Sequence, residues 1–306
     1  MRNLFSICLL VLLGACTTKK ITPPEGAAFS LQMSTEGADK FENYIHSLTV
    51  YAFRLLADGS YVYNRTIAVL DSADIVALRD GSAKGDSKLL DMQLPVGKYK
   101  LFFIGNANGK ISGSPEVGVT LPQELTVSAQ TTGEENVYFL GSIDAVLTGV
   151  FIPPLHVILT RTVSKLILIL YEVPSEIKSV RLSLGNISSS IGIDGSLSGQ
   201  AVNVQQTFGL DSIGVFEKDT VVCQILTMPS ISGSSPFNLT FQTYHGQEKT
   251  KEMQPLAFLP NKYIRLTAII KDDPGAFLSF DVVVYYLIFD FLQDIQLPDF
   301  PLNPYR

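Results

Sequence analysis

The chain has 306 residues, of which 46% are apolar and 17% are charged, and its formal net charge is −6. A mildly acidic chain lacks the basic face that nucleic acid requires, so we expect no nucleic-acid partner. A chain of this length is expected to form two domains of ordinary size.

The first fifteen residues have the pattern of an export signal. Arg2 supplies a positive charge, and the apolar run behind it is shorter than the ~20 residues that cross a bilayer. Leu13, Gly14 and Ala15 then lead directly into Cys16. This order resembles the lipobox of bacterial lipoproteins, which implies a signal peptide over 1–15, cleavage between Ala15 and Cys16, and acyl chains such as palmitate on Cys16. The alternative is an ordinary signal peptide followed by a chance cysteine.

Three acyl chains on Cys16 would hold the mature chain at the outer membrane, where a single chain is marginal. The segment that follows contains Pro23, Pro24 and several polar residues. We therefore expect a lipidated linker over 16–28.

Beyond this linker the sequence has β character, because runs rich in Val, Ile, Leu, Thr, Tyr and Phe alternate with frequent Gly and Pro. Residues 46–70 contain two such runs around Asp58-Gly59, a pair typical of hairpin turns. Residues 94–109 form another expected strand, and residues 73–85 suit a short helix or a turn.

Three later segments, 177–186, 237–246 and 263–272, alternate apolar and polar residues. A period of two with one polar face predicts half-buried strands of a β-sandwich. The residues expected to face the core are Val180, Leu182, Leu184, Phe237, Leu239, Phe241, Ile264, Leu266, Ala268 and Ile270.

A domain boundary is predicted at Pro153-Pro154, where the strands of a first unit end and a long strand over 156–173 opens a second. We therefore expect an all-β chain with an N-terminal β-sandwich over 29–153 and a C-terminal β-sandwich over 154–306. A parallel βαβ arrangement would need helical stretches between strands, and the sequence contains few.

The sequence has no pattern typical of a catalytic or metal site. His46, His156 and His245 lie far apart and lack the short spacing of metal ligands, so we expect surface or hydrogen-bonded histidines. Cys223 lies in an apolar run, where a buried and inert thiol is expected. We predict no enzyme activity, no cofactor, no metal and no small-molecule substrate.

Two features of the sequence bear on carbohydrate, one on glycan binding and the other on glycosylation. Twelve tyrosines could stack on sugars, but Trp is absent and strand packing explains most of the tyrosines, so a glycan-binding lipoprotein is an alternative. Three tripeptides are similar to the Asp-Ser/Thr-apolar signal for O-glycosylation in Bacteroidota. The candidate acceptors are Ser72, Ser212 and Thr220.

Four segments together resemble the fimbrillin-type pilins, which are type V pilus lipoproteins of Bacteroidota. In chain order they are HSLTVYAFRLLADGSYV, LPVGKYKLFFIGNANG, LTRTVSKLILIL and LPNKYIRLTAII. The resemblance implies two tandem transthyretin-like, Greek-key β-sandwich domains. It also implies a non-enzymatic fimbrial subunit at the cell surface, with other fimbrial subunits as partners and with roles in pilus assembly and cell adhesion.

In that family a protease cuts after an Arg behind the first strand, and a strand of a neighbouring subunit fills the vacated groove. This chain has no Arg between Cys16 and Arg54, and Arg54 lies in a predicted strand. Residues 27–33 and the lipid would then stay in place, as in an anchor or minor subunit. A different protease, or cleavage at Lys40, is the alternative, and within the family a polymerising stalk or tip fimbrillin is the alternative role.

Residues 277–291 are apolar on both faces and form a strand that would aggregate unless it is paired. One expectation is that part of this segment closes the second sandwich. A second hypothesis is that its last portion, with the residues behind it, pairs with another subunit. Deleting residues 287–306 would then abolish partner capture and leave the monomer folded.

Overall fold

The computed structural model describes residues 27–35, 45–75, 89–107, 110–128, 137–148, 152–210, 220–273 and 276–288. Over these residues the chain is almost entirely β, as the sequence predicts, with a helical turn at 72–75 and a short 3-10 helix, η2 (Pro122–Glu124). The strands are β1 (Ala27–Thr35), β2 (Leu48–Leu55), β3 (Tyr61–Leu70), β4 (Leu89–Leu94), β5 (Gly97–Gly105), β6 (Ile111–Ser112), β7 (Thr126–Ser128), β8 (Phe139–Leu147), β9 (Leu155–Arg161), β10 (Ser164–Tyr171), β11 (Ile177–Gly192), β12 (Leu197–Gly209), β13 (Val221–Thr227), β14 (Ser235–Thr243), β15 (Glu248–Leu256), β16 (Lys262–Asp273) and β17 (Ala276–Ile288).

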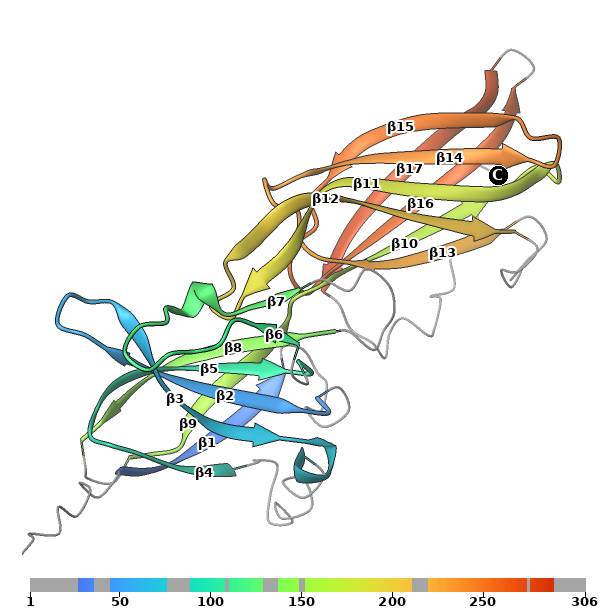
Figure 1. The fold of residues 1–306 in the computed structure, drawn as a ribbon. Coiled ribbons are helices and arrows are strands. Elements are labelled where there is room, and N and C mark those ends of the chain that lie inside the picture. The colour runs from blue at the N-terminus through green and yellow to red at the C-terminus, as the bar shows by residue number, and fades with distance from the viewer. Residues whose placement is uncertain are drawn as a thin grey trace, which may run out of the picture.

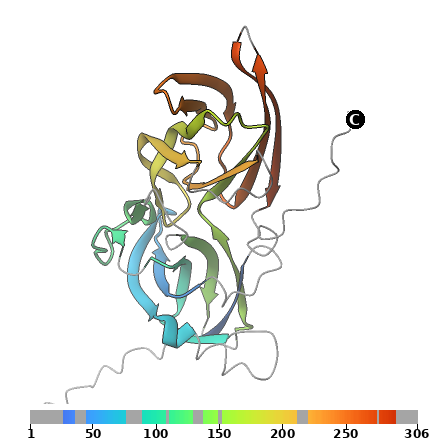
Figure 2. The ribbon, with the colours of Figure 1, turned by 90° about the vertical axis from the view of Figure 1, so that its right-hand side faces the viewer.

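The described strands form three sheets. A seven-stranded sheet has the order β3-β2-β5-β8-β9-β1-β4, and a four-stranded sheet has the order β13-β10-β16-β17. A six-stranded sheet runs β15-β14-β11-β7-β6, with β12 paired to β11. The molecule is elongated, with the seven-stranded sheet towards one end and β13–β17 towards the other (Figures 1 and 2).

The alternating segments fold as the sequence predicts. Each of the ten apolar side chains expected in the core of 177–186, 237–246 and 263–272 is at most 1% exposed. They lie on β11, β14 and β16, which belong to the four- and six-stranded sheets. Period two is therefore a reliable guide here, because these strands have one face in the core and one outside it.

The predicted hairpin at Asp58-Gly59 joins β2 to β3. Asp58 Oδ1 accepts hydrogen bonds from the Ser60 side chain at 2.7 Å and from the Ser60 N–H at 2.9 Å, which together lower the pKa of Asp58. Gly59 has φ +87°, a conformation that side chains rarely adopt. A second Asp-Gly-Ser turn over 194–196, which the sequence reading missed, joins β11 to β12 with the same hydrogen bonds.

The single long strand predicted over 156–173 is wrong: the segment forms two strands in two sheets. β9 pairs with β1 and β8, and β10 pairs with β13 and β16. The sheets change between Thr162, whose N–H donates to Tyr138 O, and Val163, whose carbonyl accepts from Asn261 N–H. Apolar residues continue through both strands, so hydrophobicity alone does not show this break, and Pro153-Pro154 precedes β9.

The long strand β11 links the two ends of the molecule. Its first half pairs with β14, whereas its last residues, 190–192, pair with 126–128 of β7. The Ile193 N–H also donates to Leu125 O at 2.9 Å. A strand from the range 29–153 thus lies in one sheet with strands from the range 154–306.

Two smaller differences concern local boundaries. β1 begins at Ala27, so the last two residues of the predicted linker 16–28 belong to a strand. Residues 72–75 are helical, and Asp71 Oδ1 accepts the N–H groups of Ala73 and Asp74 at 2.8 and 3.0 Å as a helix cap. No helix within the described ranges is both long and apolar enough to pass through a membrane.

Candidate functional site

The first strand, β1, is an interior strand of the seven-stranded sheet. Residues 27–32 pair antiparallel with β4, and residues 31–35 pair in parallel with 155–159 of β9. The strand therefore fills the space between two neighbours (Figure 1). Its removal would separate β4 from β9 and leave two rows of main-chain groups without their partners.

Alternate side chains of β1 enter the core. Phe29, Leu31 and Met33 are 4%, 0% and 5% exposed, and the residues between them are partly exposed. Burial of a side chain of this size contributes roughly 1.5–3 kcal/mol, as an upper estimate. The three side chains together hold β1 in its own sheet with an energy comparable to the stability of a whole domain.

A side-chain contact also joins β1 to β9 on the outer face. Ser34 Oγ lies 3.1 Å from His156 Nε2. The contact is diagonal, because His156 of β9 stands directly opposite Gln32 of β1. Sequence analysis could not predict this pair, since the two residues are 122 positions apart and only the sheet brings them together.

The other two histidines lie elsewhere. His46 donates its backbone N–H to Asn106 Oδ1 at 2.8 Å, and His245 is exposed in the turn between β14 and β15. Within the described part of the chain, no three His, Cys, Asp or Glu residues are grouped as metal ligands. The expectation of surface or hydrogen-bonded histidines is confirmed.

Arg54, the first Arg after the signal segment, lies within β2 and is exposed. β2 runs between β3 and β5, and Arg54 pairs with Val62 on one side and Tyr99 on the other. A protease must draw several residues of its substrate into an extended conformation. Cleavage at Arg54 would therefore require two sheet pairings to open first.

The apolar C-terminal segment joins a sheet, as one of the two expectations held. β17 pairs antiparallel with β16, from Asp273 opposite Ala276 to Lys262 opposite Ile288. It is the last strand of the four-stranded sheet within the described residues. Residues 289–306, on which the hypothesis of pairing with another subunit rests, lie outside the described residues.

The predicted modification sites are only partly within the described ranges. Ala15, Cys16 and Ser212 lie outside them. Ser72 is exposed at the start of the helical turn, and its Oγ donates to His46 O at 2.9 Å. Thr220 is half-buried just before β13.

Cys223 behaves as the sequence predicts. It is 1% exposed on β13, and burial raises the pKa of its thiol to about 12. A thiol with this pKa is almost wholly protonated at neutral pH, so it is a poor nucleophile and a poor metal ligand.

Four of the tyrosines in the described ranges are packing residues. Tyr51, Tyr63, Tyr99 and Tyr138 are each at most 8% exposed. Tyr63 packs edge-to-face against Tyr51 and Phe53, with ring centroids 6.1 and 5.8 Å apart. These rings cannot stack on a sugar, which agrees with the interpretation that strand packing explains them.

A pocket of about 230 Å³ lies where β8 and β9 meet the turn between β11 and β12. Its wall includes Arg161, which is 2% exposed and lies over the Phe139 ring, 5.4 Å from the ring centroid. Pockets for small molecules usually have ~300–1,000 Å³. The hollow is therefore small for a ligand site, and its walls come from both ends of the molecule.

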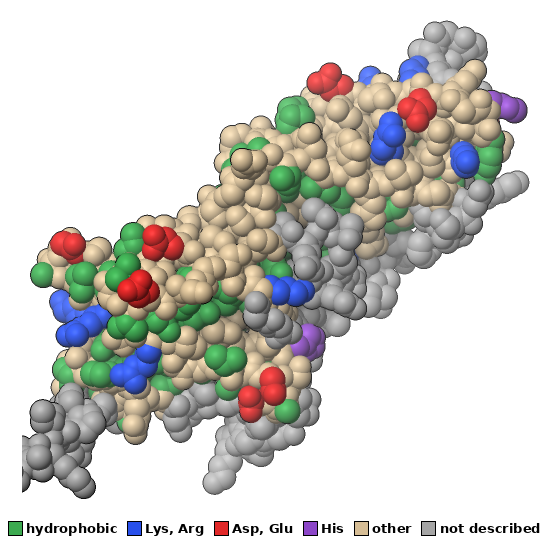
Figure 3. All heavy atoms as spheres, in the orientation of Figure 1, with side chains coloured by type: hydrophobic (Ala, Val, Ile, Leu, Met, Phe, Trp, Pro, Cys, Tyr) green, Lys and Arg blue, Asp and Glu red, His purple; other side chains and the backbone are tan. Residues whose placement is uncertain are grey.

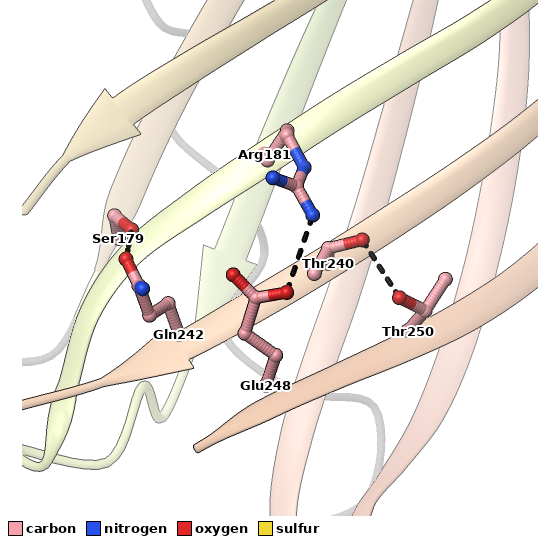
Figure 4. Close-up of polar contacts among 6 residues, drawn as sticks. All are labelled: Ser179, Arg181, Thr240, Gln242, Glu248 and Thr250. Atoms are coloured by element: carbon pink, nitrogen blue, oxygen red, sulfur yellow. Dashed lines mark hydrogen bonds and ion pairs between the residues drawn. The ribbon is translucent and has the colours of Figure 1, made fainter. Parts of the chain in front are cut away.

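The outer face of β11, β14 and β15 is polar. Cross-strand hydrogen bonds join Ser179 to Gln242 and Thr240 to Thr250, and an ion pair of 3.4 Å joins Arg181 to Glu248 (Figure 4). On the molecular surface, Lys, Arg, Asp and Glu side chains are scattered over this view and apolar side chains gather mainly over the end that carries the seven-stranded sheet (Figure 3).

Solved structures with the same fold are numerous, and three are informative. The fimbrial anchor protein Mfa2 from Porphyromonas gingivalis matches 86% of this chain and 98% of that chain, with a TM-score of 0.57 and 15% identity. A fimbrial assembly protein from Parabacteroides distasonis matches 85% and 98%, with a TM-score of 0.51 and 13% identity. A candidate polysaccharide-binding protein from Bacteroides thetaiotaomicron matches 87% and 99%, with a TM-score of 0.61 and 13% identity. At such identities these structures show a shared fold alone.

The sequence comparison identifies a family. No curated protein matches the chain. A sequence model of the fimbrillin-A associated anchor proteins Mfa1 and Mfa2 matches residues 22–263, which is most of the chain and includes β1 to the start of β16. The chain therefore belongs to the family of the fimbrillin-A associated anchor proteins.

Proposed function

We propose that this chain is a fimbrial subunit of the anchor or minor type, held at the outer membrane by lipid on Cys16. Membership of the family associates it with the cell envelope and with other fimbrial subunits, and supports a structural role. The observation that carries the proposal is the position of β1, which occupies an interior place in its own sheet with three large side chains in the core.

The sequence ahead of β1 supports a lasting attachment. Ten residues separate Cys16 from Ala27, and no Arg follows Cys16 before Arg54. Because Arg54 is paired on both sides within β2, it is a poor site for an Arg-specific protease, and no Arg lies between β1 and β2. The lipid, the linker and β1 then stay together as one covalent tether.

We propose that assembly uses β-strand complementation at the other end of the chain. β17 lies at the end of the four-stranded sheet and continues at Ile288 into a segment with Phe289, Phe291, Ile295 and Leu297. Alternating apolar residues of this kind suit a strand that enters a groove of another subunit. Leu287 and Ile288 belong to β17, so the informative deletion removes residues 289–306 rather than 287–306.

The two ends of the molecule are our candidates for two tandem β-sandwich domains. The change of sheet at Thr162-Val163 supports a boundary there rather than at Pro153-Pro154. Separate expression of residues 27–162 and 163–306 tests the division, since a true domain unfolds cooperatively by itself.

Mass spectrometry of the N-terminus of the native protein tests the anchor role. We expect an acylated Cys16 in the assembled form, with β1 present. A mature protein that starts near residue 41 or residue 55 would contradict the anchor role and favour the alternative, a polymerising stalk or tip fimbrillin.

A variant with a new cleavage site gives a sharper test. Lys40→Arg places an Arg between β1 and β2, and we expect an Arg-specific protease to cut the chain there in this variant alone. Lys40→Gln is the matched control and should remain intact. Equal cleavage between β1 and β2 of the unchanged chain would show that another protease already processes it.

Deletion of residues 289–306 tests strand complementation. We expect the truncated chain to fold as before and to lose capture of partner fimbrial subunits in a pull-down from the native cell envelope. Unfolding of the truncated chain, or unchanged capture, would exclude the segment as a donor strand.

A glycan-binding role is the second alternative, and the three predicted O-glycosylation sites remain proposals. Of these, Ser72 is exposed, whereas Thr220 is half-buried. Intact-mass measurement of the native protein before and after Ser72→Ala, Ser212→Ala and Thr220→Ala would show which sites carry sugar. Binding to a polysaccharide array would have to be demonstrated before a glycan role is preferred.

A further inference from the structure

We propose that the parallel pair β1–β9 is a mechanical joint that resists tension between the lipid anchor and the rest of the subunit. The inference rests on the proposed function, because it takes the N-terminal side of β1 as the attached side. It adds a function to that proposal, because the pair would set the force at which β1 separates from the rest of a tethered subunit.

The direction of the two strands is the first argument. Tension from the membrane would enter β1 at Ala27, and tension from the other end of the molecule would enter β9 at Arg161, through Thr162 and Val163. Because the strands are parallel, these two points lie at opposite ends of the pair. The pull therefore slides the strands past each other and loads all of their hydrogen bonds at the same time.

The same bonds would be far weaker under a different pull. Force applied to both strands at one end peels them apart, so that each hydrogen bond breaks alone. An antiparallel arrangement of β1 and β9 would have produced this peeling geometry, since Arg161 would then have stood beside the N-terminal end of β1. The parallel direction of β1 and β9 therefore decides whether their hydrogen bonds are loaded together or one at a time.

Side chains on both faces of the pair oppose sliding. On the inner face Leu31 and Met33 of β1 are buried with Val157 and Leu159 of β9, all at most 5% exposed. On the outer face the Ser34–His156 contact crosses the pair. A shift of one residue would turn the buried side chains of β1 to the outer face.

The tension passes from β9 into β10, and β10 is also held on two sides. β9 continues through Thr162 and Val163 into β10, which lies between β13 and β16 in the four-stranded sheet. The β10–β16 pairing is again parallel and extends over 165–171 and 263–269. The β7–β11 pairing adds a second connection between the two ends of the molecule.

Single-molecule force spectroscopy on the chain from Cys16 to Arg306, made without lipid, tests the joint. One handle is attached to Cys16 and the other to Ser175→Cys, an exposed position after β10. Cys223 does not compete for the label, because it is buried and its pKa is about 12. We expect a high-force event in which β1 is released and the strands between β1 and β9 then unfold, which lengthens the chain by roughly 450 Å, the extended length of that segment.

The matched measurement pulls the same two strands from one end. A chain with Cys16→Ser and Ser34→Cys places the handle at the C-terminal end of β1, and we expect a rupture force several-fold lower. Ser34→Ala with the handle on Cys16 controls for the lost contact with His156 and should retain most of the high force. Equal forces in the two directions would overturn the proposal.

Two disulfide locks locate the event. Gln32→Cys with His156→Cys joins directly opposite residues of β1 and β9, so we expect the high-force event to disappear and to return on reduction. Ser30→Cys with Asp91→Cys joins β1 to β4 instead and should keep the event, with the chain extension shorter by roughly 200 Å. An event that survives the first lock would show that another part of the molecule fails.

Failure of the joint and failure of the anchor role are separate outcomes. The force measurement uses no lipid and no membrane, so it reports on β1 and β9 whatever the state of Cys16 in the cell. An acylated native N-terminus with equal forces in both directions would leave the anchor role standing and remove the joint.

Discussion

Two strands of nine residues each, β1 and β15, have opposite characters. β1 is an interior strand, and alternate side chains along its whole length are buried. β15 is the outer strand of the six-stranded sheet, and only Leu256 among its residues is buried. Equal length therefore says nothing about how firmly a strand is held. The difference lies in which residues stand at the positions that face the core.

The core-facing positions of β15 show how an outer strand is kept from pairing with other molecules. Lys249 and Lys251 stand opposite Phe241 and Leu239 of β14, whose side chains are fully buried. A lysine at such a position must extend around the sheet edge to reach water, which discourages a further strand from adding there. In β1 the equivalent positions hold Phe29 and Leu31, so that strand depends on neighbours on both sides.

The largest expected effect follows from a charge on the inner face of β1. Leu31→Asp buries a carboxylate at a position that is 0% exposed, and it should lower the free energy of unfolding by more than about 4 kcal/mol. Gln32→Asp, on the partly exposed face of the same strand, is the control and should cost less than about 1 kcal/mol. Urea unfolding followed by circular dichroism measures both. Similar losses for the two variants would mean that the inner face of β1 is not a buried face.

A smaller effect is expected on β15. Thr250→Ala removes the 2.8 Å hydrogen bond to Thr240, which is 5% exposed, and should cost about 0.5–1.5 kcal/mol in the same unfolding measurement. Thr250→Ser keeps the hydroxyl and should recover most of the loss. A cost as large as that of Leu31→Asp would remove the distinction between the interior strand and the outer one.

The ion pair on the same polar face should matter less. Arg181 and Glu248 have side chains that are 40% and 47% exposed, so Glu248→Gln should cost about 0.2–1 kcal/mol. The difference from the unchanged chain should fade in about 1 M salt, because exposed charges are screened. A loss that persists at high salt would point to packing rather than charge.

The smallest change in stability is expected from Lys251→Val, but this variant should alter association. Removing this charge takes away one obstacle to a further strand at the edge of β15, so sedimentation velocity should show concentration-dependent self-association with nearly unchanged unfolding. Lys251→Arg is the control and should stay monomeric under the same conditions. A monomeric Lys251→Val chain would show that other features protect this edge.

Periodicity and turn chemistry predicted much of the fold. The alternation in β11, β14 and β16 named ten core residues correctly, and Asp58-Gly59 marked the first hairpin, because local residue pattern and backbone geometry suffice for both. The β9–β10 break was missed because apolar residues continue through it. The partners of each strand were also beyond the sequence, since pairing joins residues such as Ser34 and His156 that lie far apart in the chain.

The amino-acid sequence alone was enough to indicate an all-β subunit of fimbrillin type and the absence of Arg between the first strand and the second. Those properties depend on local composition, spacing and the order of short segments. The sheet order required the folded chain, because it depends on which distant strands meet. In the folded chain β1 and β9 lie side by side and parallel. A pull on the N-terminal end of β1 would therefore load this pair in shear, which the sequence of β1 alone could not indicate.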